Sequence, residues 1–174
     1  MVPTPARRER DSAYRLGAFV LLLAIIGIST ALAFEYFGGY APCPLCLMQR
    51  WAYYAAIPVL FIALVLVTAE HPRWAAALFS AVFLAFLANA GLGAYHAGAE
   101  WQFWPGPDTC ASTTLPLRAS AGTLLEQLAQ PAPVVRCDRA AWRLFGLSFA
   151  GWNVLVSLAA SAASLQAALT ASPR

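Results

Sequence analysis

Four cysteines, at positions 43, 46, 110 and 137, are the residues whose type and spacing point most directly to chemistry. Cys43 and Cys46 form a Cys-x-x-Cys motif, in which the two sulfurs can close a small disulfide ring and a thiol can have a lowered pKa. Cys110 and Cys137 lie 27 positions apart, a spacing that suits a disulfide closing a loop. The two pairs therefore predict thiol–disulfide chemistry in an oxidising compartment.

Cysteine pairs have two other common uses, zinc binding and structural disulfides. Structural zinc sites usually repeat the short spacing or add a histidine pair, and the second pair here does not repeat it. We therefore expect no metal. Purely structural disulfides explain Cys110 and Cys137 well. They explain Cys43 and Cys46 poorly, because closing so short a ring constrains little chain entropy.

Arg50 follows Cys46 by four positions, so both lie on one face if a helix has already begun. An uncompensated arginine at the boundary of a membrane span is costly and is usually functional. We predict that Arg50 holds a negative charge, either a thiolate or a bound oxyanion. The alternative is an arginine that only reaches out to the lipid headgroups.

The elements that must position these residues follow from composition. The chain has 174 residues, of which 60% are hydrophobic and 11% charged, against about 25% charged in soluble domains. This excludes a soluble monomer and a disordered chain. All eleven basic residues are arginines, and no basic stripe with interleaved aromatics supports nucleic-acid binding. A membrane protein is the class that remains.

Four uncharged stretches are long enough to cross a bilayer core, which needs roughly 20 apolar residues as a helix. We place the spans at about 16–34, 51–69, 74–95 and 146–168, the last within an apolar stretch that ends at Ala171. The prediction is an all-α, four-helix transmembrane bundle that forms a single integral membrane domain, residues 1–174. Loops at about 35–50 and 96–145 hold one cysteine pair each. Small residues in the last span, Ser157, Ser161 and Ser164, suit helix packing.

The sidedness prediction rests on arginines near the span ends. The segment before the first span is basic, with Arg7, Arg8, Arg10 and Arg15. We therefore place both termini in the cytoplasm and both cysteine loops on the oxidising side. The alternative is a cleavable signal peptide ending near Ala31-Leu32-Ala33. Its apolar part is longer than the usual 7–15 residues, so an uncleaved span is favoured.

The longer loop has a pattern of its own. His96, Glu100 and Trp101 follow the third span, and an amphipathic helical stretch begins at Thr123. Such a stretch can lie along the membrane surface. We expect the loop to be tethered and able to bring Cys137 towards Cys43.

The chain resembles the DsbB family, the bacterial membrane oxidases that generate disulfides with a quinone. The resemblance rests on an ordered set of motifs: Cys43-Pro-Leu-Cys-Leu-Met-Gln-Arg50, Tyr95-His96, Glu100, the Trp-Pro-Gly-Pro run before Cys110, and Cys137 followed by Phe145-Gly-Leu-Ser-Phe-Ala-Gly-Trp152. By motif it covers roughly residues 35–152, and by topology the whole chain.

The resemblance implies a relay between two disulfides in the bacterial inner membrane. A periplasmic DsbA-type protein is reoxidised at Cys110, Cys137 then attacks Cys43, and Cys46 is released as a thiolate beside the quinone, ubiquinone or menaquinone. Arg50 and His96 match family residues at the quinone site. In the resting oxidised state we expect disulfides Cys43–Cys46 and Cys110–Cys137.

Two further functions compete with this interpretation. A four-span enzyme of the vitamin K epoxide reductase type also places a Cys-x-x-Cys beside a quinone, but usually nearer the later spans. A membrane scaffold with structural disulfides needs no quinone at all. Within the DsbB pattern one position departs: Phe149 stands where the family often has methionine, which puts the detailed shape of the pocket in doubt.

Overall fold

Four long helices make up most of the described chain. The computed structural model describes residues 4–106 and 136–172, so the predictions for Cys110 and for the stretch beginning at Thr123 lie outside it. The helices are α1 (Pro5–Tyr36), α2 (Pro44–Thr68), α3 (Pro72–Glu100) and α5 (Phe149–Ala171). Each is long and apolar enough to cross a membrane. The predicted four-helix membrane bundle is confirmed.

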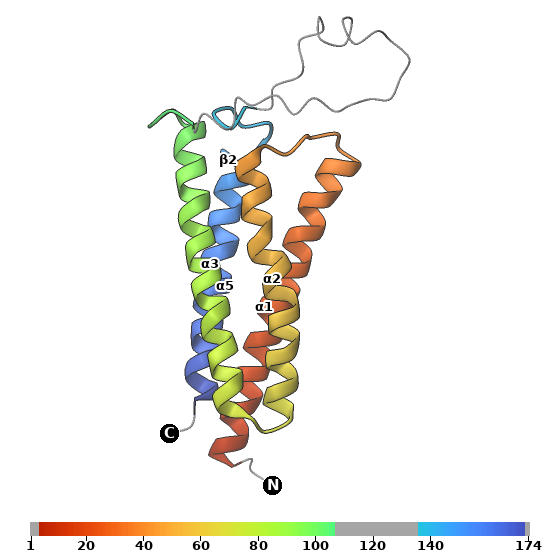
Figure 1. Ribbon diagram of the computed structural model, residues 1–174, viewed down its shortest axis with the longest axis vertical. Coiled ribbons are helices and arrows are strands. Elements are labelled where there is room, and N and C mark those ends of the chain that lie inside the picture. The colour runs from red at the N-terminus through yellow and green to blue at the C-terminus, as the bar shows by residue number, and fades with distance from the viewer. Residues whose placement is uncertain (1–3, 107–135, 173–174) are drawn as a thin grey trace, which may run out of the picture.

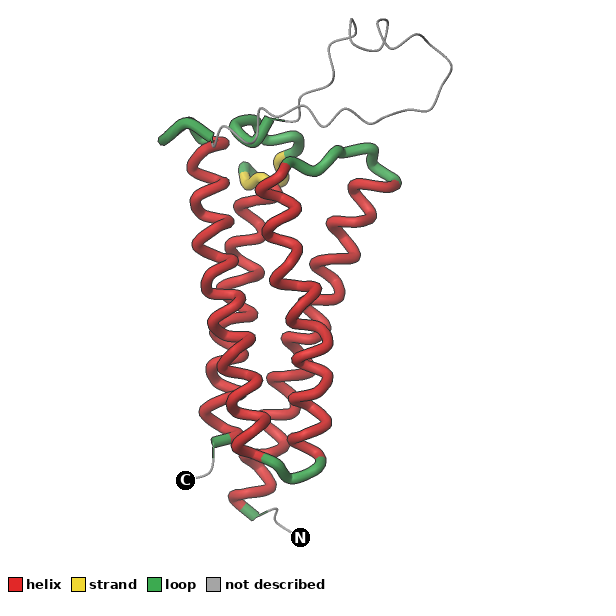
Figure 2. Tube along the Cα trace, in the orientation of Figure 1, coloured by secondary structure: helices red, strands yellow, loops and turns green. Residues whose placement is uncertain are grey.

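The helices stand side by side and run alternately up and down (Figure 1). Helix α1 contacts α2 and α5, and α3 contacts the same two helices, so the four close into a ring. The chain enters and leaves at one end of the bundle, and the connection between α1 and α2 lies at the other end (Figure 2). This places the Cys-x-x-Cys motif at the end opposite to the termini.

Helix α2 begins seven residues before the predicted span, at Pro44 instead of Trp51. Proline suits the first position of a helix because it has no N–H to leave unpaired. The sulfur of Cys43 caps the helix by accepting a hydrogen bond from the backbone N–H of Cys46, at 3.3 Å. The span boundary predicted from hydropathy missed this start, and Cys46 and Arg50 are helical.

Helix α3 continues to Glu100, five residues beyond the predicted end at Tyr95. His96 and Glu100 therefore lie one turn apart on a helix, and not in the long loop as predicted. Both side chains are buried. Because this last turn is polar, a boundary drawn from hydropathy ends the span before it, although the turn faces the bundle interior.

A short hairpin precedes α5, where the predicted span begins at Gly146. Strands β1 (Arg143–Leu144) and β2 (Leu147–Ser148) pair antiparallel. The two turn residues, Phe145 and Gly146, both have positive φ, 51° and 82°, which is the signature of a type I′ turn. Ser148 then caps α5 by accepting a hydrogen bond from the Gly151 N–H at 3.2 Å, so the helix begins at Phe149.

The interior of the bundle combines large side chains with small ones. Phe79 and Phe86 of α3 and Leu60 of α2 are fully buried. Helix α5 faces them with small residues, and all three serines predicted to serve packing are buried: Ser157, Ser161 and Ser164. Because lipid is as apolar as leucine, such close packing is what holds membrane helices together.

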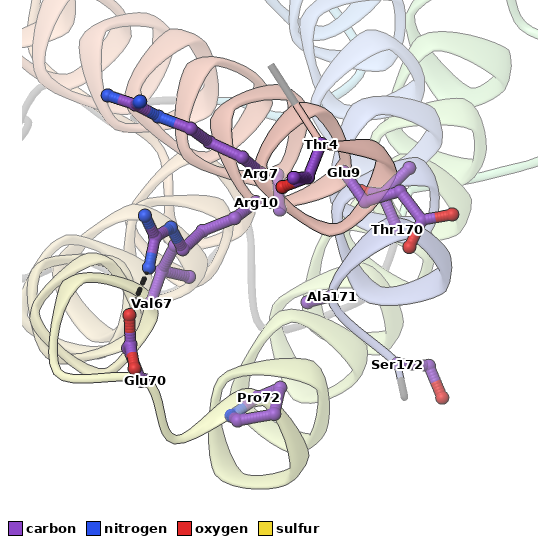
Figure 3. A pocket seen from close by; sticks show the side chains of 11 residues that line it. Thr4, Arg7, Glu9, Arg10, Val67, Glu70, Pro72, Thr170, Ala171 and Ser172 are labelled. Carbon is purple, nitrogen blue, oxygen red and sulfur yellow. Dashed lines mark hydrogen bonds and ion pairs between the residues drawn. The ribbon is translucent and has the colours of Figure 1, made fainter. Parts of the chain in front are cut away.

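The end that carries the termini is joined by an ion pair. Arg10 of α1 contacts Glu70, in the link between α2 and α3, and both residues line a cavity of about 520 Å³ (Figure 3). Both side chains are exposed, so the pair contributes little to stability. It ties the start of α1 to the α2–α3 link, at the opposite end of α2 from Cys43.

Candidate active site

The Cys-x-x-Cys motif lies at the first turn of α2. The sulfurs of Cys43 and Cys46 are 2.9 Å apart, and both residues are free thiols. The structure thus contains the dithiol form of the pair, and not the disulfide that the sequence analysis expects in the resting oxidised protein. Cys43 is buried and Cys46 is partly buried.

His96 lies against Cys43. Its Nε2 atom is 3.6 Å from the Cys43 sulfur, and its Nδ1 atom is 2.9 Å from the side-chain amide nitrogen of Gln49. A carboxylate oxygen of Glu100, one turn further along α3, lies 3.8 Å from His96 Nε2. The imidazole is only 2% exposed, so these neighbours define its surroundings.

The contacts of Cys43 favour its thiolate form. The hydrogen bond from the Cys46 thiol lowers the pKa of Cys43 from 9.0 to about 5. Burial opposes this shift, while the adjacent His96 and the backbone N–H of Cys46 add to it. The sequence analysis expects the stabilised thiolate at Cys46. In the dithiol form the stabilising contacts meet at Cys43 instead, because it is Cys43 that occupies the cap of α2.

Cys137, which precedes the β1–β2 hairpin in the chain, lies beside Cys43 and His96. It is 1% exposed, and its sulfur is part of a disulfide. The sulfurs of Cys43 and Cys137 and a ring nitrogen of His96 all lie within 4.8 Å of one another. Metals are bound by thiolates, so a sulfur held in a disulfide gives the zinc interpretation no support. The proximity instead suits exchange between sulfurs.

Arg50 lies one turn after Cys46 and forms an ion pair with Glu35, at the end of α1. The sequence analysis treats this arginine as uncompensated, which is wrong. Glu35 provides the compensation, and the Arg50 side chain is only 12% exposed. The ion pair fixes the guanidinium near the Cys-x-x-Cys motif. An arginine that only reached out to the lipid headgroups would not require such a partner.

A cavity of about 560 Å³ opens between α1, α2 and α5 beside the motif. Cys46, Arg50 and His96 line its polar end. Three aromatic rings, those of Phe34, Trp142 and Phe149, form part of its wall. The Trp142 and Phe149 rings stack with centroids 4.9 Å apart, and Phe34 meets Phe149 edge-on at the same distance. Phe149 therefore shapes the wall by aromatic packing.

The remainder of the cavity is apolar and continues along α1 to Leu23 and Ile26, with Val156 of α5 opposite. These residues lie within the parts of α1 and α5 that can cross a membrane. The cavity thus connects the cysteine end of the bundle with the depth of the bilayer.

Several site residues were missed by the sequence analysis. Glu35 pairs with Arg50, Gln49 holds His96, and Asn153 of α5 donates a hydrogen bond to Gln49 at 2.7 Å. A signal was available for Gln49 and Asn153, because polar side chains within a membrane span are expensive and are commonly functional. For Glu35 the signal was a lone carboxylate at the end of a span.

Comparisons with known proteins identify the family of this chain. Residues 13–167 match the family described as disulfide bond formation protein DsbB. Two relatives are named disulfide bond formation protein B. The protein from Aromatoleum aromaticum is 30% identical, covering 80% of this chain and 81% of the relative. That from Albidiferax ferrireducens is 28% identical, covering 84% and 82%.

An uncharacterized protein of Rickettsia prowazekii, RP370, is 25% identical, covering 86% of this chain and 84% of its own length. No solved structure matches the chain significantly.

The chain is a multi-pass membrane protein. Its Cys-x-x-Cys pair, with a disulfide cysteine and a cavity beside it, places it in the class of membrane proteins that carry out thiol–disulfide chemistry. The family match makes the class specific: this chain belongs to the DsbB family of disulfide bond formation proteins.

Proposed function

We propose that the protein is a thiol:quinone oxidoreductase that reoxidises a periplasmic dithiol protein of the DsbA type and passes two electrons to a membrane quinone. The observation that supports this most is the position of the dithiol. Cys43 lies within 4.8 Å of the Cys137 sulfur on one side, and Cys46 lines the apolar cavity on the other. The pair lies between a protein disulfide and a space reaching into the bilayer.

The relay is a series of thiol–disulfide exchanges, in each of which one S–S bond breaks and one forms. A partner thiolate attacks Cys110 and releases Cys137 as a thiolate. Cys137 attacks Cys43 of the oxidised pair, forming a Cys43–Cys137 bond and releasing Cys46. The partner's second thiol then displaces Cys110, and the partner leaves with a disulfide. Cys110 attacks Cys137 and releases Cys43, so both electrons now reside in the Cys43–Cys46 dithiol.

The lowered pKa of Cys43 favours the last of these exchanges. A thiol of low pKa is a good leaving group, and Cys43 is the leaving group when Cys110 attacks Cys137. The hydrogen bond from Cys46 and the neighbouring His96 both stabilise the departing thiolate.

The cavity residues fit a lipid quinone, ubiquinone or menaquinone. Such a molecule has a polar ring and a long apolar tail, and the cavity has a polar end at Cys46 and Arg50 and an apolar remainder at Leu23 and Ile26. The quinone supplies an acceptor for two electrons and two protons at a potential above that of a DsbA-type partner, about −120 mV. Arg50 provides a fixed positive charge that stabilises a developing oxyanion or thiolate.

The orientation in the membrane is part of the proposal. The whole chain acts as one integral domain in the bacterial inner membrane, with both termini cytoplasmic and the cysteine end periplasmic. Two observations support it: the basic start of α1 lies at the end with the termini, and the start of α2, which Cys43 caps beside Cys46 and Cys137, lies at the opposite end. Disulfides persist on the periplasmic side.

The test is quinone reduction by purified protein in detergent, without oxygen, with a reduced DsbA-type protein as donor. We expect rapid reduction by the unaltered protein and none by Cys46→Ser. Cys110→Ala should lose reduction driven by the partner, while its chemically reduced Cys43–Cys46 pair is still oxidised by quinone. Absence of quinone reduction by the folded, unaltered protein would show that the cysteines are only structural.

A further inference from the structure

A series of hydrogen-bonded polar side chains crosses the bundle interior below the cysteines. It begins at His96 on α3, passes through Gln49 on α2, and reaches Asn153 on α5. His96 and Gln49 are 2% and 5% exposed. Helices α2 and α5 lie diagonally across the ring, so Gln49 and Asn153 meet in its centre.

The direction of the series is set at Asn153. Its side-chain oxygen accepts from the Tyr53 hydroxyl at 2.6 Å and from the Asn89 amide at 3.3 Å. The oxygen is therefore the acceptor end of this amide. The nitrogen end donates to the side-chain oxygen of Gln49 at 2.7 Å. An amide nitrogen only donates. Reversing Asn153 alone would lose its bonds with Asn89 and Gln49, and reversing Gln49 alone would lose its bond with Asn153.

The same logic continues to the histidine. Because the Gln49 oxygen is already an acceptor, its nitrogen faces His96 Nδ1, at 2.9 Å. Nδ1 must then be the acceptor. A neutral imidazole has one donor and one acceptor nitrogen, so the proton resides on Nε2. Nε2 is the nitrogen that faces the Cys43 sulfur.

We propose that Gln49 and Asn153 are positioning residues that fix His96 in the tautomer with its proton on Nε2, so that His96 donates to the Cys43 sulfur and does not act as its base. This rests on the proposed function, in which Cys43 is a leaving group. With the proton on Nε2, the imidazole stabilises the Cys43 thiolate but has no lone pair facing it. The proton of Cys43 must therefore leave by another path.

The charged and titratable groups around His96 are consistent with this role. Cys43 faces it from the cap of α2, Cys137 lies beside that sulfur, and Glu100 on its own helix is 3.8 Å from Nε2. Arg143 of β1 interacts electrostatically with Glu100. The two groups that face Nε2 directly, the Cys43 sulfur and the Glu100 carboxylate, are acceptors and potential anions, which suits an N–H and would repel a bare lone pair.

The direct test reads the tautomer by 15N NMR of histidine-labelled protein. The chain has two histidines, and the exposed His71 can be replaced because its side chain makes no cap bond. In His71→Gln we expect a protonated Nε2 and an unprotonated Nδ1. Adding Gln49→Leu or Asn153→Leu should abolish this preference. The matched control is Ser161→Ala, which removes a buried hydrogen bond of α5, to the Phe83 carbonyl, outside the series.

The second readout is the ionisation of Cys43 with pH, followed by thiolate absorbance of the reduced protein. We expect Gln49→Leu to move the midpoint upward by about one unit and Ser161→Ala to leave it in place. A proton on Nδ1 in the unaltered protein, or an unchanged tautomer and midpoint in folded Gln49→Leu, would overturn the proposal. Neither readout uses a quinone or a protein partner, so the proposed function can succeed or fail independently.

Discussion

Cys43 is the residue at which most of the site's contacts meet. It caps α2, shares a hydrogen bond with Cys46, and lies next to His96 and Cys137. Its position makes the motif asymmetric: the Cys43 sulfur caps the helix, is buried and has a lowered pKa, whereas Cys46 is only partly buried. The Cys-x-x-Cys spacing predicts the reactive pair and the contact between its two sulfurs, but it does not predict the contribution of His96, which lies 53 positions away.

The first prediction concerns the hydrogen bond between the two thiols. Because it is the largest cause of the lowered Cys43 pKa, Cys46→Ala should raise that pKa well above 5, towards the ordinary value. Cys46→Ser keeps a donor and should raise it much less. The measurement is thiolate absorbance against pH in fully reduced protein, with Cys43→Ser as the blank. Equal midpoints in the two variants would contradict this assignment.

A second prediction separates the catalytic and structural roles of Arg50. If its charge stabilises negative charge at the cavity, Arg50→Gln should slow quinone reduction by a factor on the order of 100. Arg50→Lys should keep part of the activity, because the charge remains but the planar fork is lost. Glu35→Gln is the matched control, since it breaks the same ion pair but leaves the guanidinium.

Steady-state quinone titration of these variants supplies kcat and KM. We expect Glu35→Gln to retain most of the activity that Arg50→Gln loses. Equal losses in Glu35→Gln and Arg50→Gln would show that the ion pair serves only the structure.

At the scale of elements, the sequence predicts that the four helices exist, but it does not predict where all of them begin and end. Uncharged stretches of about 20 residues leave few alternatives to membrane spans, so all four helices were predicted. The start of α2 and the end of α3 were not, because their terminal turns carry polar residues that face the bundle interior. Those two turns hold Cys46, Gln49, His96 and Glu100, so most of the site lies where hydropathy is least informative.

The close approach of α1 to its neighbours gives a prediction at this scale. A side-chain carbon at Gly17 would lie 2.7 Å from the Phe79 ring and 2.9 Å from Leu64. Gly17→Ala should therefore lower the free energy of unfolding by about 1–3 kcal/mol. Gly91→Ala is the control, because a side-chain carbon at Gly91 meets nothing within 4 Å. SDS titration in mixed micelles measures both, and an equal stability of the two variants would refute the packing argument.

At the scale of the whole molecule, the bundle separates two ends of different character. One end carries both termini and the basic start of α1, and the other carries the start of α2 (Figure 1). Cys43 caps α2 there, and the Cys46 and Cys137 sulfurs lie close to it. The even number of spans in the described chain puts the termini together. The prediction of which compartment each end faces rests on the four arginines that precede the first predicted span, Arg7, Arg8, Arg10 and Arg15.

The orientation can be checked with fusions to the C-terminus of the full chain in bacterial cells. A green fluorescent protein fusion should fluoresce, because this reporter folds in the cytoplasm, and an alkaline phosphatase fusion should be inactive. The control is the same pair of reporters fused after Tyr40, between α1 and α2, where the pattern should invert. A fluorescent fusion at Tyr40 with active phosphatase at the C-terminus would reverse the proposed topology.

The most direct measurement is the ratio of partner disulfides formed to quinone molecules reduced. Oxidised protein, a reduced DsbA-type partner and a short-chain ubiquinone are mixed without oxygen. Partner thiols are counted by alkylation and mass spectrometry, and quinone by its absorbance. Two electrons pass in each cycle, so we predict one disulfide for each quinone over many turnovers, and neither product with Cys43→Ser. Partner oxidation that continues without quinone reduction, or quinone reduction that persists in Cys43→Ser, would contradict a relay through the Cys43–Cys46 pair.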